Sequence, residues 1–374
     1  MGDCESISVI AGQRGAHVSR RCIFTLASLG IAVLAPTPVL PCTTVCLLEK
    51  DKAVVAYNYD FYPPEGLVLV NKRGTRKVSS LRTQGAAWAA TYGSVTFNQF
   101  GRDNPMTGIN EKGLMVSQMW LDETKYPPAD TRPVIGILEW IQYNLDRHAS
   151  VSEVLANAET VRPASRAASI HYLVTDATGD AAVVEFLDGK LAVHRGGAMP
   201  VRALANSTYA DSVAAFERAR SKGEMPTSTS SLDRFVRAAM LAGGGNADPI
   251  ARGFEILASV AQPYFTRWSI VYDLSAREVY FTTEGNRAIR RFALAGFDFS
   301  CGTPVKILDV TAGGAGDVGS AFVDYSAAAN RALIESAFAK TPFLREVPAS
   351  ARDTFAAHPE ATSSCGAANG ALSR

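Results

Sequence analysis

Residues 42–60 read CTTVCLLEKDKAVVAYNYD, and this stretch decides which fold the sequence predicts. It contains two short apolar runs, Thr44–Leu48 and Ala53–Tyr57, on either side of the charged segment 49–52. Two such runs around a short polar segment are typical of antiparallel strands joined in a hairpin. The sequence therefore predicts a β-hairpin whose first strand directly follows Cys42.

Similar patterns continue along the chain. Further strands are predicted at 67–71, 94–98, 114–120, 171–175, 181–186, 191–194, 269–273 and 278–282. Helices are predicted after Pro133, after the capping residue Ser150, and at 209–222, 232–242, 249–262 and 326–340. The segment 106–113 contains two glycines and is predicted to be a polar turn. Strands, then helices, then strands and helices again favour a layered α+β architecture over alternating βαβ units.

Residues 1–41 differ from the rest of the chain. Ser19-Arg20-Arg21 precedes the apolar run Cys22–Leu34, which is the order of an export signal and also resembles a twin-arginine signal. We predict that 1–41 is an export signal with a short pro-segment, that 42–345 is one domain, and that 346–374 is a loose polar tail. The cleavage point stays open, because Pro36 follows the small residue Ala35; a buried N-terminal helix is the alternative. The expected location is the periplasm or the cell exterior.

The composition argues against several classes of function. A formal net charge of +1 over 374 residues gives no basic footprint for nucleic acid. The cysteine and histidine spacings fit no metal site, and no glycine-rich nucleotide motif occurs, so neither metal nor cofactor is expected. No apolar run of about 18 residues follows the signal, so no membrane anchor is expected in the mature form. Cys301 and Cys365 are the candidates for a disulfide in an exported protein.

Cys42 gains its importance from its position just beyond the predicted signal. One cleavage would leave the α-amine of Cys42 free beside its thiol. The amine titrates near neutral pH and can accept the thiol proton, and the thiolate is the nucleophile. Such a site needs no histidine, which agrees with the five scattered histidines of this chain. We therefore predict that Cys42 is the nucleophile; the alternative is a buried structural thiol.

Five separated segments carry a resemblance to a known family. They are Cys42-Thr43-Thr44 with Asn58-Tyr59-Asp60, Asn110–Leu114, Leu204–Ser207, Asp233–Arg237 and Thr266–Trp268. In this order they resemble the choloylglycine hydrolases, which include bile salt hydrolases and penicillin V acylases. The resemblance implies a four-layer αββα sandwich of the N-terminal-nucleophile hydrolase kind. It also implies hydrolysis of a linear amide through a Cys42 acyl-enzyme, without a cofactor, and a homo-oligomer that is a homotetramer in the family.

The resemblance assigns roles to individual residues. Cys42 matches the nucleophile, and Asp60 matches the carboxylate that holds the free amine. Asn206 matches the side-chain donor of an oxyanion hole, and the backbone N–H of Trp120 matches the second donor. Arg234 matches an arginine whose charge favours the thiolate.

One position departs from the family. An arginine usually stands three residues before the aspartate, and this chain has Tyr57 there. The change removes a positive charge from beside the nucleophile unless Arg237 or Arg267 supplies one.

Each assigned residue also has a structural alternative. Asp60 could cap a turn, Asn206 could cap the helix at 209, and Arg234 could face solvent from its helix. Asn110–Gly113 is interpreted as a structural turn, and Cys46 as a packed thiol on the same side of its strand as Cys42.

The segment 119–127, MWLDETKYP, bears on the substrate. It resembles the Gram-negative penicillin V acylases more than the bile salt hydrolases, which have an asparagine at the position of Trp120. An indole there suits an aromatic or long acyl chain, although Trp120 could instead belong to the core. Tyr57 is a second candidate pocket residue. Penicillin V or an N-acyl homoserine lactone is the expected substrate.

Three alternatives stay open. The first is a bile salt hydrolase, and the second is a lipid-anchored binding protein, against which Pro41 before Cys42 argues. The third is an inactive relative that only binds a ligand.

Overall fold

The computed structural model describes residues 42–49, 52–81, 83–165, 167–243 and 248–366. The predicted export signal and pro-segment, 1–41, lie outside the described residues and stay a prediction. Among the helices of the described residues, none is long and apolar enough to cross a bilayer.

The first large sheet is built around the predicted hairpin. The strands assigned to it among the described residues are, in spatial order, β14 (Ala203–Leu204), β1 (Thr43–Glu49), β2 (Lys52–Asp60), β15 (Thr266–Asp273), β16 (Glu278–Thr283), β17 (Asn286–Ala293) and β19 (Gly316–Asp317). β1 and β2 pair antiparallel from Thr43↔Asn58 to Glu49↔Lys52, so the hairpin prediction is confirmed.

The second large sheet faces the first. Its described strands are, in spatial order, β13 (Lys190–Arg195), β12 (Ala181–Leu187), β11 (Ile170–Thr175), β8 (Met115–Trp120), β7 (Pro105–Asn110), β6 (Ser94–Asn98), β3 (Leu67–Asn71), β18 (Lys306–Asp309) and β20 (Val323–Asp324). Two small sheets pair β9 (Val134–Gly136) with β10 (Arg162–Ala164), and β4 (Thr75–Val78) with β5 (Ala87–Ala89) and β21 (Ser364–Cys365).

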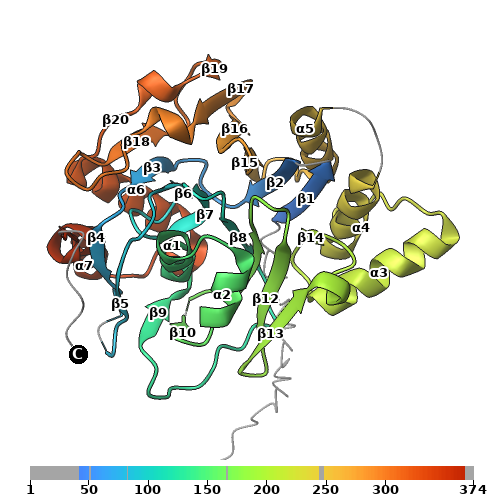
Figure 1. Ribbon diagram of the computed structural model, residues 1–374, viewed down its shortest axis with the longest axis horizontal. Helices are drawn as coiled ribbons and strands as arrows, with labels where there is room; N and C mark the ends of the chain where they lie inside the picture. The colour runs from blue at the N-terminus through green and yellow to red at the C-terminus, as the bar shows by residue number, and fades with distance from the viewer. Residues whose placement is uncertain (1–41, 50–51, 82, 166, 244–247, 367–374) are drawn as a thin grey trace, which may run out of the picture. The chain divides into compact units, whose positions relative to one another are not determined.

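Helices cover the outer faces of both sheets. They are α1 (Ile137–Arg147), α2 (Val151–Asn157), α3 (Tyr209–Lys222), α4 (Ser231–Ala242), α5 (Pro249–Val260), α6 (Ala327–Lys340) and α7 (Ala349–Thr362). α4 packs on β1 and β14, α5 packs on β2 and β15, and α3 packs on α4, whereas α1 packs on β7 and β8 of the second sheet (Figure 1). The predicted four-layer αββα sandwich is therefore confirmed.

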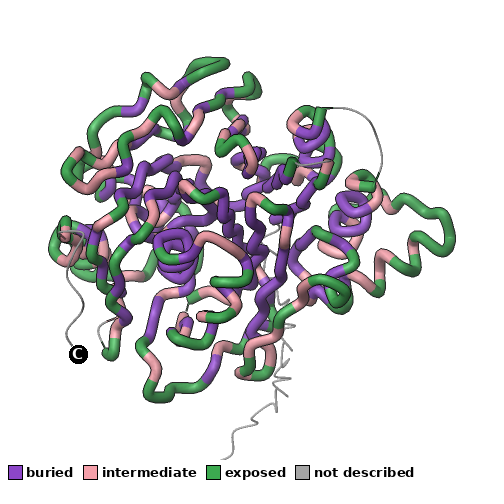
Figure 2. Tube along the Cα trace, in the orientation of Figure 1, coloured by how far each residue is buried: buried purple, intermediate pink, exposed green. Residues whose placement is uncertain are grey.

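The two largest buried clusters of the described residues fill most of the space between these layers, where Figure 2 shows the buried residues. Strand β11 shows how one strand serves both. Leu173 belongs to the cluster that joins the two sheets, while its neighbours Tyr172 and Val174 belong to the cluster beneath α1 and α2. Successive side chains of a strand point to opposite faces, so a strand covered on both sides is buried along its whole length.

The C-terminal segment differs from its prediction as a loose tail. Residues 349–362 form α7, which packs on α6, and β21 then pairs with β4. The ring of Phe355 lies 6.0 Å from that of Phe338 on α6. A disulfide joins Cys365 to Cys301, as the sequence suggested. The helix contains Pro359 and has no side-chain cap, so its stability comes from tertiary contacts that a local pattern does not reveal.

The segment 106–113 was also only partly a turn. Pro105–Asn110 is the buried strand β7, and the turn is confined to the residues that follow. Gly108 is required by close packing, because a Cβ there would lie 2.6 Å from the Thr96 Cγ2 atom. Its neighbours β6 and β8 hydrogen-bond to this strand on both sides, which compensates for its poor strand propensity.

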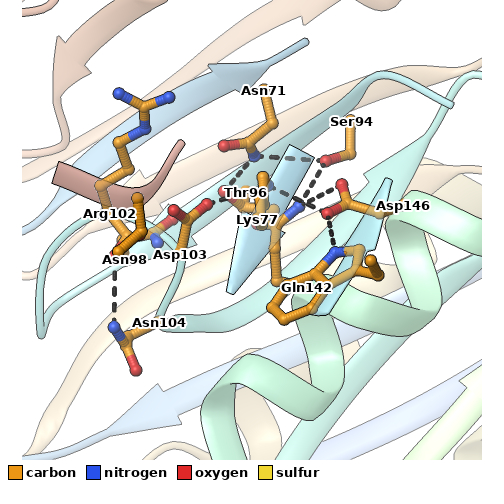
Figure 3. A network of polar contacts seen from close by, with 12 residues as sticks. Asn71, Lys77, Ser94, Thr96, Asn98, Arg102, Asp103, Asn104, Gln142 and Asp146 are labelled. Carbon is orange, nitrogen blue, oxygen red and sulfur yellow. Dashed lines mark hydrogen bonds and ion pairs between the residues drawn. The ribbon is translucent and has the colours of Figure 1, made fainter. Parts of the chain in front are cut away.

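A buried polar network fixes β4 to α1 (Figure 3). The Nζ atom of Lys77 lies 2.9 Å from Asp103 Oδ1 and 3.0 Å from Asp146 Oδ2. Gln142 and Trp88 each donate a hydrogen bond to Asp146, both over 2.8 Å. Because the two carboxylates face one ammonium, this network is a buried ion cluster that holds β4 against α1.

Candidate active site

The β1–β2 hairpin brings Cys42 and Asp60 to the same end of the first sheet. Thr43 pairs with Asn58, so the residue before β1 lies beside the last residue of β2. The Sγ atom of Cys42 lies 3.9 Å from the backbone oxygen of Asp60. Both residues are buried. Two predicted site residues are therefore neighbours.

Asn206 approaches Cys42 from the other edge of β1. It follows two residues after β14, the strand that pairs with that edge. Its Oδ1 atom accepts a hydrogen bond of 2.8 Å from the backbone N–H of Cys42. Its Nδ2 atom donates to the backbone oxygen of Trp120 over 2.9 Å. The cap of α3 is Thr208, whose side chain accepts from the Asp211 N–H. The alternative role of Asn206 as the helix cap is therefore wrong.

Arg234 lies on α4 with its guanidinium directed into the site. Its Nη1 atom donates to the Cys42 backbone oxygen over 2.6 Å and to Thr43 Oγ1 over 2.5 Å. Its Nη2 atom donates to Asn206 Oδ1 over 2.8 Å. The side chain is fully buried, so the alternative of a solvent-facing arginine is wrong.

The strand register indicates where the Trp120 N–H points. The backbone of Leu121 bonds toward β11, because its N–H donates to Ser169 O. The backbone of Leu114 bonds toward β7, because its C=O accepts from the Asn110 N–H. Successive residues of β8 therefore bond alternately toward β11 and β7. By this alternation the N–H and C=O of Trp120 point away from β11, toward the side of β7. The pairing of β7 with β8 ends at Thr107↔Ser117, so that ladder does not extend to Trp120. The Trp120 N–H thus points to the side on which its C=O binds Asn206.

Tyr57 contacts the sulfur itself. Its hydroxyl lies 3.8 Å from Cys42 Sγ and donates to the Gln118 backbone oxygen over 3.1 Å. Burial and the nearby charge of Asp60 raise the pKa of the Cys42 thiol to about 12, against the lowering effect of Tyr57 and Arg234. In the chain that still carries residues before Cys42, the thiol is therefore held protonated at neutral pH.

Neither of the other arginines supplies the charge that Tyr57 lacks. Arg237 donates to the backbone oxygens of Ser259, Pro226 and Ser228, and Arg267 pairs with Glu284 and donates to the Phe61 backbone oxygen. Among the cations named at the predicted site, Arg234 is the one that donates to Cys42.

Asp60 is a buried carboxylate with an unusual environment. Within the described part of the chain, neither of its carboxylate oxygens has a hydrogen-bond partner. Burial raises the pKa of Asp60 to about 7, against the lowering effect of the positive charges of Arg234 and Arg267. A buried acid without a partner is destabilising when ionised, unless a cation comes to face it.

This environment predicts a pH-dependent stability for the uncleaved chain. The folded-state pKa of Asp60, about 7, lies above the ordinary 3.8, so its contribution to stability is fully present below about pH 4 and is lost as the pH rises through 7. Asp60→Asn imitates the protonated carboxyl. We expect it to raise the free energy of unfolding at pH 8 by up to about 4 kcal/mol, with little change at pH 4. Urea unfolding of both uncleaved proteins across this range measures the difference, and a difference independent of pH would contradict the assignment.

Cys46 is the second free thiol of the described residues. It is buried in the core cluster, and burial raises the pKa of its thiol to about 12 as well. Its thiol pKa therefore resembles that of Cys42, and the two cysteines differ instead in the residues around them. The prediction of a packed thiol agrees with its place in the core. The described residues contain no group of three or more His, Cys, Asp or Glu side chains that could hold a metal ion.

The side chain of Trp120 is half-buried, and its ring centroid lies 5.9 Å from that of Phe343. Trp120 also lines a cavity of about 440 Å³, together with Thr124, Tyr126 and Arg162. The lining of this cavity does not include Cys42, Asp60, Asn206 or Arg234, so it is separate from the thiol. Trp120 is thus not a fully buried core residue.

Comparison with known proteins identifies the family. Residues 42–307 match the linear amide C–N hydrolases of the choloylglycine hydrolase family. The chain belongs to the choloylglycine hydrolase family. The match begins at Cys42, the residue on which the buried contacts converge. The matched range also includes the β1–β2 hairpin, Asn206 and Arg234, whereas α6 and α7 lie beyond it.

Two relatives are similar over long stretches. The chain is 27% identical over 242 residues to a penicillin V acylase from Pectobacterium atrosepticum, covering 52% of this chain and 64% of that protein. It thus spans less than two thirds of that relative. The structure of a penicillin V acylase from Agrobacterium tumefaciens superposes with a TM-score of 0.69 at 26% identity, over 76% of this chain and 98% of that one.

A more distant structure shares the fold. A variant of conjugated bile acid hydrolase from Clostridium perfringens superposes with a TM-score of 0.63 at 18% identity, over 71% of this chain and 96% of that one. The choloylglycine hydrolase sandwich is therefore common to both branches.

Some residues of this choloylglycine hydrolase site were missed from the sequence. Thr43 accepts from Arg234, and its place directly after Cys42 in the quoted motif was the available signal. The contact of Phe343 with Trp120 could not be predicted, because it depends on how the C-terminal segment packs.

Proposed function

We propose that the mature protein hydrolyses the linear amide bond of an N-acyl substrate, with Cys42 as an N-terminal nucleophile. The observation that carries the proposal is the environment of the Cys42 nitrogen. This atom, which becomes the α-amine after cleavage, is held by Asn206, and the charge of the buried Asp60 carboxylate acts on the thiol of the same residue. An α-ammonium group would add a positive charge that favours the ionised form of Asp60.

The reaction that we propose has two halves. In the first, the α-amine of Cys42 accepts the thiol proton, and the sulfur bonds to the acyl carbon while the carbonyl electron pair moves onto oxygen. This oxyanion accepts hydrogen bonds from the Trp120 N–H and the Asn206 amide, which together are worth several kcal/mol. The C–N bond then breaks, the leaving nitrogen takes the proton, and a thioester remains.

In the second half, water attacks the thioester. The α-amine of Cys42 takes a proton from the water, and the hydroxyl oxygen bonds to the acyl carbon. The C–S bond then breaks, the carboxylic acid leaves, and the proton returns to sulfur. Cleavage before Cys42 thus acts as a switch, because the new positive charge lowers the pKa of a thiol that is otherwise about 12.

The N-terminus of the active protein tests this proposal. We expect the mass of the purified mature chain to begin at Cys42, and iodoacetamide to inactivate it with one alkylation at that residue. Removal of residues 1–41 also requires export or a maturation step, so we propose a periplasmic or extracellular location. A fully active chain that retains Pro41 would contradict the one-residue mechanism.

The aromatic surface beside the site favours an apolar acyl group. Phe61, which follows Asp60, lies 6.5 Å from Phe343, and Phe343 lies 5.9 Å from Trp120, measured between ring centroids. Phe343 is 45% exposed and so can still bury surface against a ligand. We propose a phenoxyacetyl group, as in penicillin V, or the fatty acyl chain of an N-acyl homoserine lactone as the acyl part.

This surface predicts the effect of removing Phe343. Phe343→Ala should raise KM for phenoxyacetyl and long-chain acyl amides about tenfold with little change in kcat, because the ring contributes uniform binding rather than transition-state contacts. Ile289→Ala on β17, which removes an equally exposed apolar side chain, is the control and should leave KM unchanged. An acetyl amide should lose little in either variant. If Phe343→Ala leaves KM for all three amides unchanged, the acyl group does not bind at this surface.

A further inference from the structure

A buried histidine–glutamate pair lies directly behind Asn206. The Nε2 atom of His171 on β11 lies 2.8 Å from the backbone oxygen of Ala205, and its Nδ1 atom lies 3.0 Å from Glu185 Oε1. All three residues are fully buried. Ala205 immediately precedes Asn206, so the imidazole fixes the backbone from which the Asn206 amide projects.

Glu185 holds the other end of the same segment. Its Oε1 atom also accepts a hydrogen bond of 2.9 Å from the backbone N–H of Tyr209, the first residue of α3. The loop 205–209 is therefore bound at both ends by one buried pair. On the far side of the loop, the Asn206 N–H donates to Ser231 Oγ over 2.8 Å.

Strand β11, which carries His171, also positions the second oxyanion donor, the Trp120 N–H. In the register of β11 and β8, Ile170 lies opposite Trp120 and His171 lies opposite Met119. The backbone of β11 thus aligns the strand that carries the Trp120 N–H, while the His171 ring aligns Asn206. The Asn206 amide and the Trp120 N–H, which come from distant parts of the chain, are therefore both positioned by β11.

The partners of His171 determine the hydrogen bond that it makes to the Ala205 oxygen. A backbone carbonyl only accepts hydrogen bonds, and Glu185 is ionised, because its bonds from His171 and His194 outweigh burial and lower the pKa of Glu185 to about 2. The Nε2 atom of His171 therefore donates to the Ala205 oxygen. Two other titratable groups face the pair. They are His194, whose Nε2 atom lies 3.2 Å from Glu185 Oε2, and Tyr209, whose pKa burial raises and the charge of Arg202 lowers.

We propose that His171, held by Glu185, is a positioning residue for the oxyanion hole formed by Asn206 and Trp120. The proposal rests on the proposed function. Displacement of a reacting or stabilising group by about 1 Å costs up to about 10²-fold in rate, so a lost contact behind Asn206 should appear in catalysis.

The experiment compares two reactions of the same thiol. Hydrolysis of a phenoxyacetyl amide needs the oxyanion hole, whereas alkylation of Cys42 by iodoacetamide does not, since no charge develops on a carbonyl oxygen. His171→Phe keeps an aromatic ring but removes both ring nitrogens. We expect kcat to fall about 10- to 100-fold, with KM and the alkylation rate changed by no more than about twofold.

Two further variants separate this role from a general role in packing. His171→Gln retains an amide donor near the position of Nε2 and should recover a large part of kcat; it also replaces His171→Phe if that variant does not fold. His148→Phe removes another buried histidine, which contacts Asn144 on α1, and should leave kcat unchanged.

Other outcomes would overturn the proposal. An unchanged kcat in His171→Phe, a parallel loss of turnover and alkylation, or no recovery in His171→Gln would each assign His171 to packing alone. A wild-type enzyme that stays active after alkylation would instead overturn the proposed nucleophile, and this proposal with it.

Discussion

Cys42→Ala is expected to reduce amide turnover by about 10⁴-fold or more, to the background rate. The variant keeps the α-amine, Asn206 and Arg234, but it removes the atom that bonds to the acyl carbon. Cys46→Ala should retain most of the wild-type activity. Both cysteines are buried on β1 or directly before it, and each substitution deletes one sulfur, so the two variants form a matched pair.

The two thiols differ in what surrounds them rather than in their pKa values, which burial raises to about 12 in both. Cys42 lies beside the Tyr57 hydroxyl and the Asp60 backbone oxygen, whereas Cys46 lies among core residues. Turnover of a phenoxyacetyl amide and the mass of each mature chain are the measurements. Full activity of Cys42→Ala in a correctly cleaved chain would show that another group is the nucleophile.

Asn206→Ala is expected to lower kcat about 10²- to 10³-fold with KM nearly unchanged, as for the loss of one oxyanion donor. The amide also holds the Cys42 nitrogen and accepts from Arg234, so the variant should lose about 1–3 kcal/mol of unfolding free energy. Stopped-flow or steady-state turnover and urea unfolding therefore have to be measured on the same preparations.

Two variants separate the catalytic loss from the structural one. Asn206→Asp keeps an acceptor for the Cys42 nitrogen and Arg234 but replaces the Nδ2 donor, so kcat should fall at least as far as in Asn206→Ala. Asn144→Ala deletes a comparable buried amide on α1 and should affect stability alone. A decrease in kcat smaller than about tenfold in both Asn206 variants would remove Asn206 from the oxyanion hole.

The local elements of this fold could be predicted from the sequence because their signals are local. The hairpin at 42–60 follows from two apolar runs around a charged segment, and its register is confirmed. The helix at 249–260 begins where Asp248 caps it by accepting from the Ala251 N–H, with Pro249 at its first position. The identity of Cys42 as the candidate nucleophile also follows from sequence, because an export signal, a cleavage and a thiol must coincide at one residue.

The C-terminal helix and strand β7 could not be predicted in this way. α7 contains a proline and Phe355 as its one large apolar side chain, and β7 contains both proline and glycine. Their local preferences oppose the structure that they adopt, and packing against α6, β6 and β8 outweighs those preferences.

The assembled site depended on tertiary structure alone. Asn206 lies 164 residues from Cys42 along the chain, and Arg234 lies 192 residues away, yet both bond to its backbone. The sequence named these residues, but it could not show that Arg234 points inward, that Thr208 rather than Asn206 caps α3, or that Tyr57 touches the sulfur. Residue types and spacing encode local hydrogen bonding and periodicity, whereas the meeting of distant side chains is fixed by how the two sheets and their helices pack.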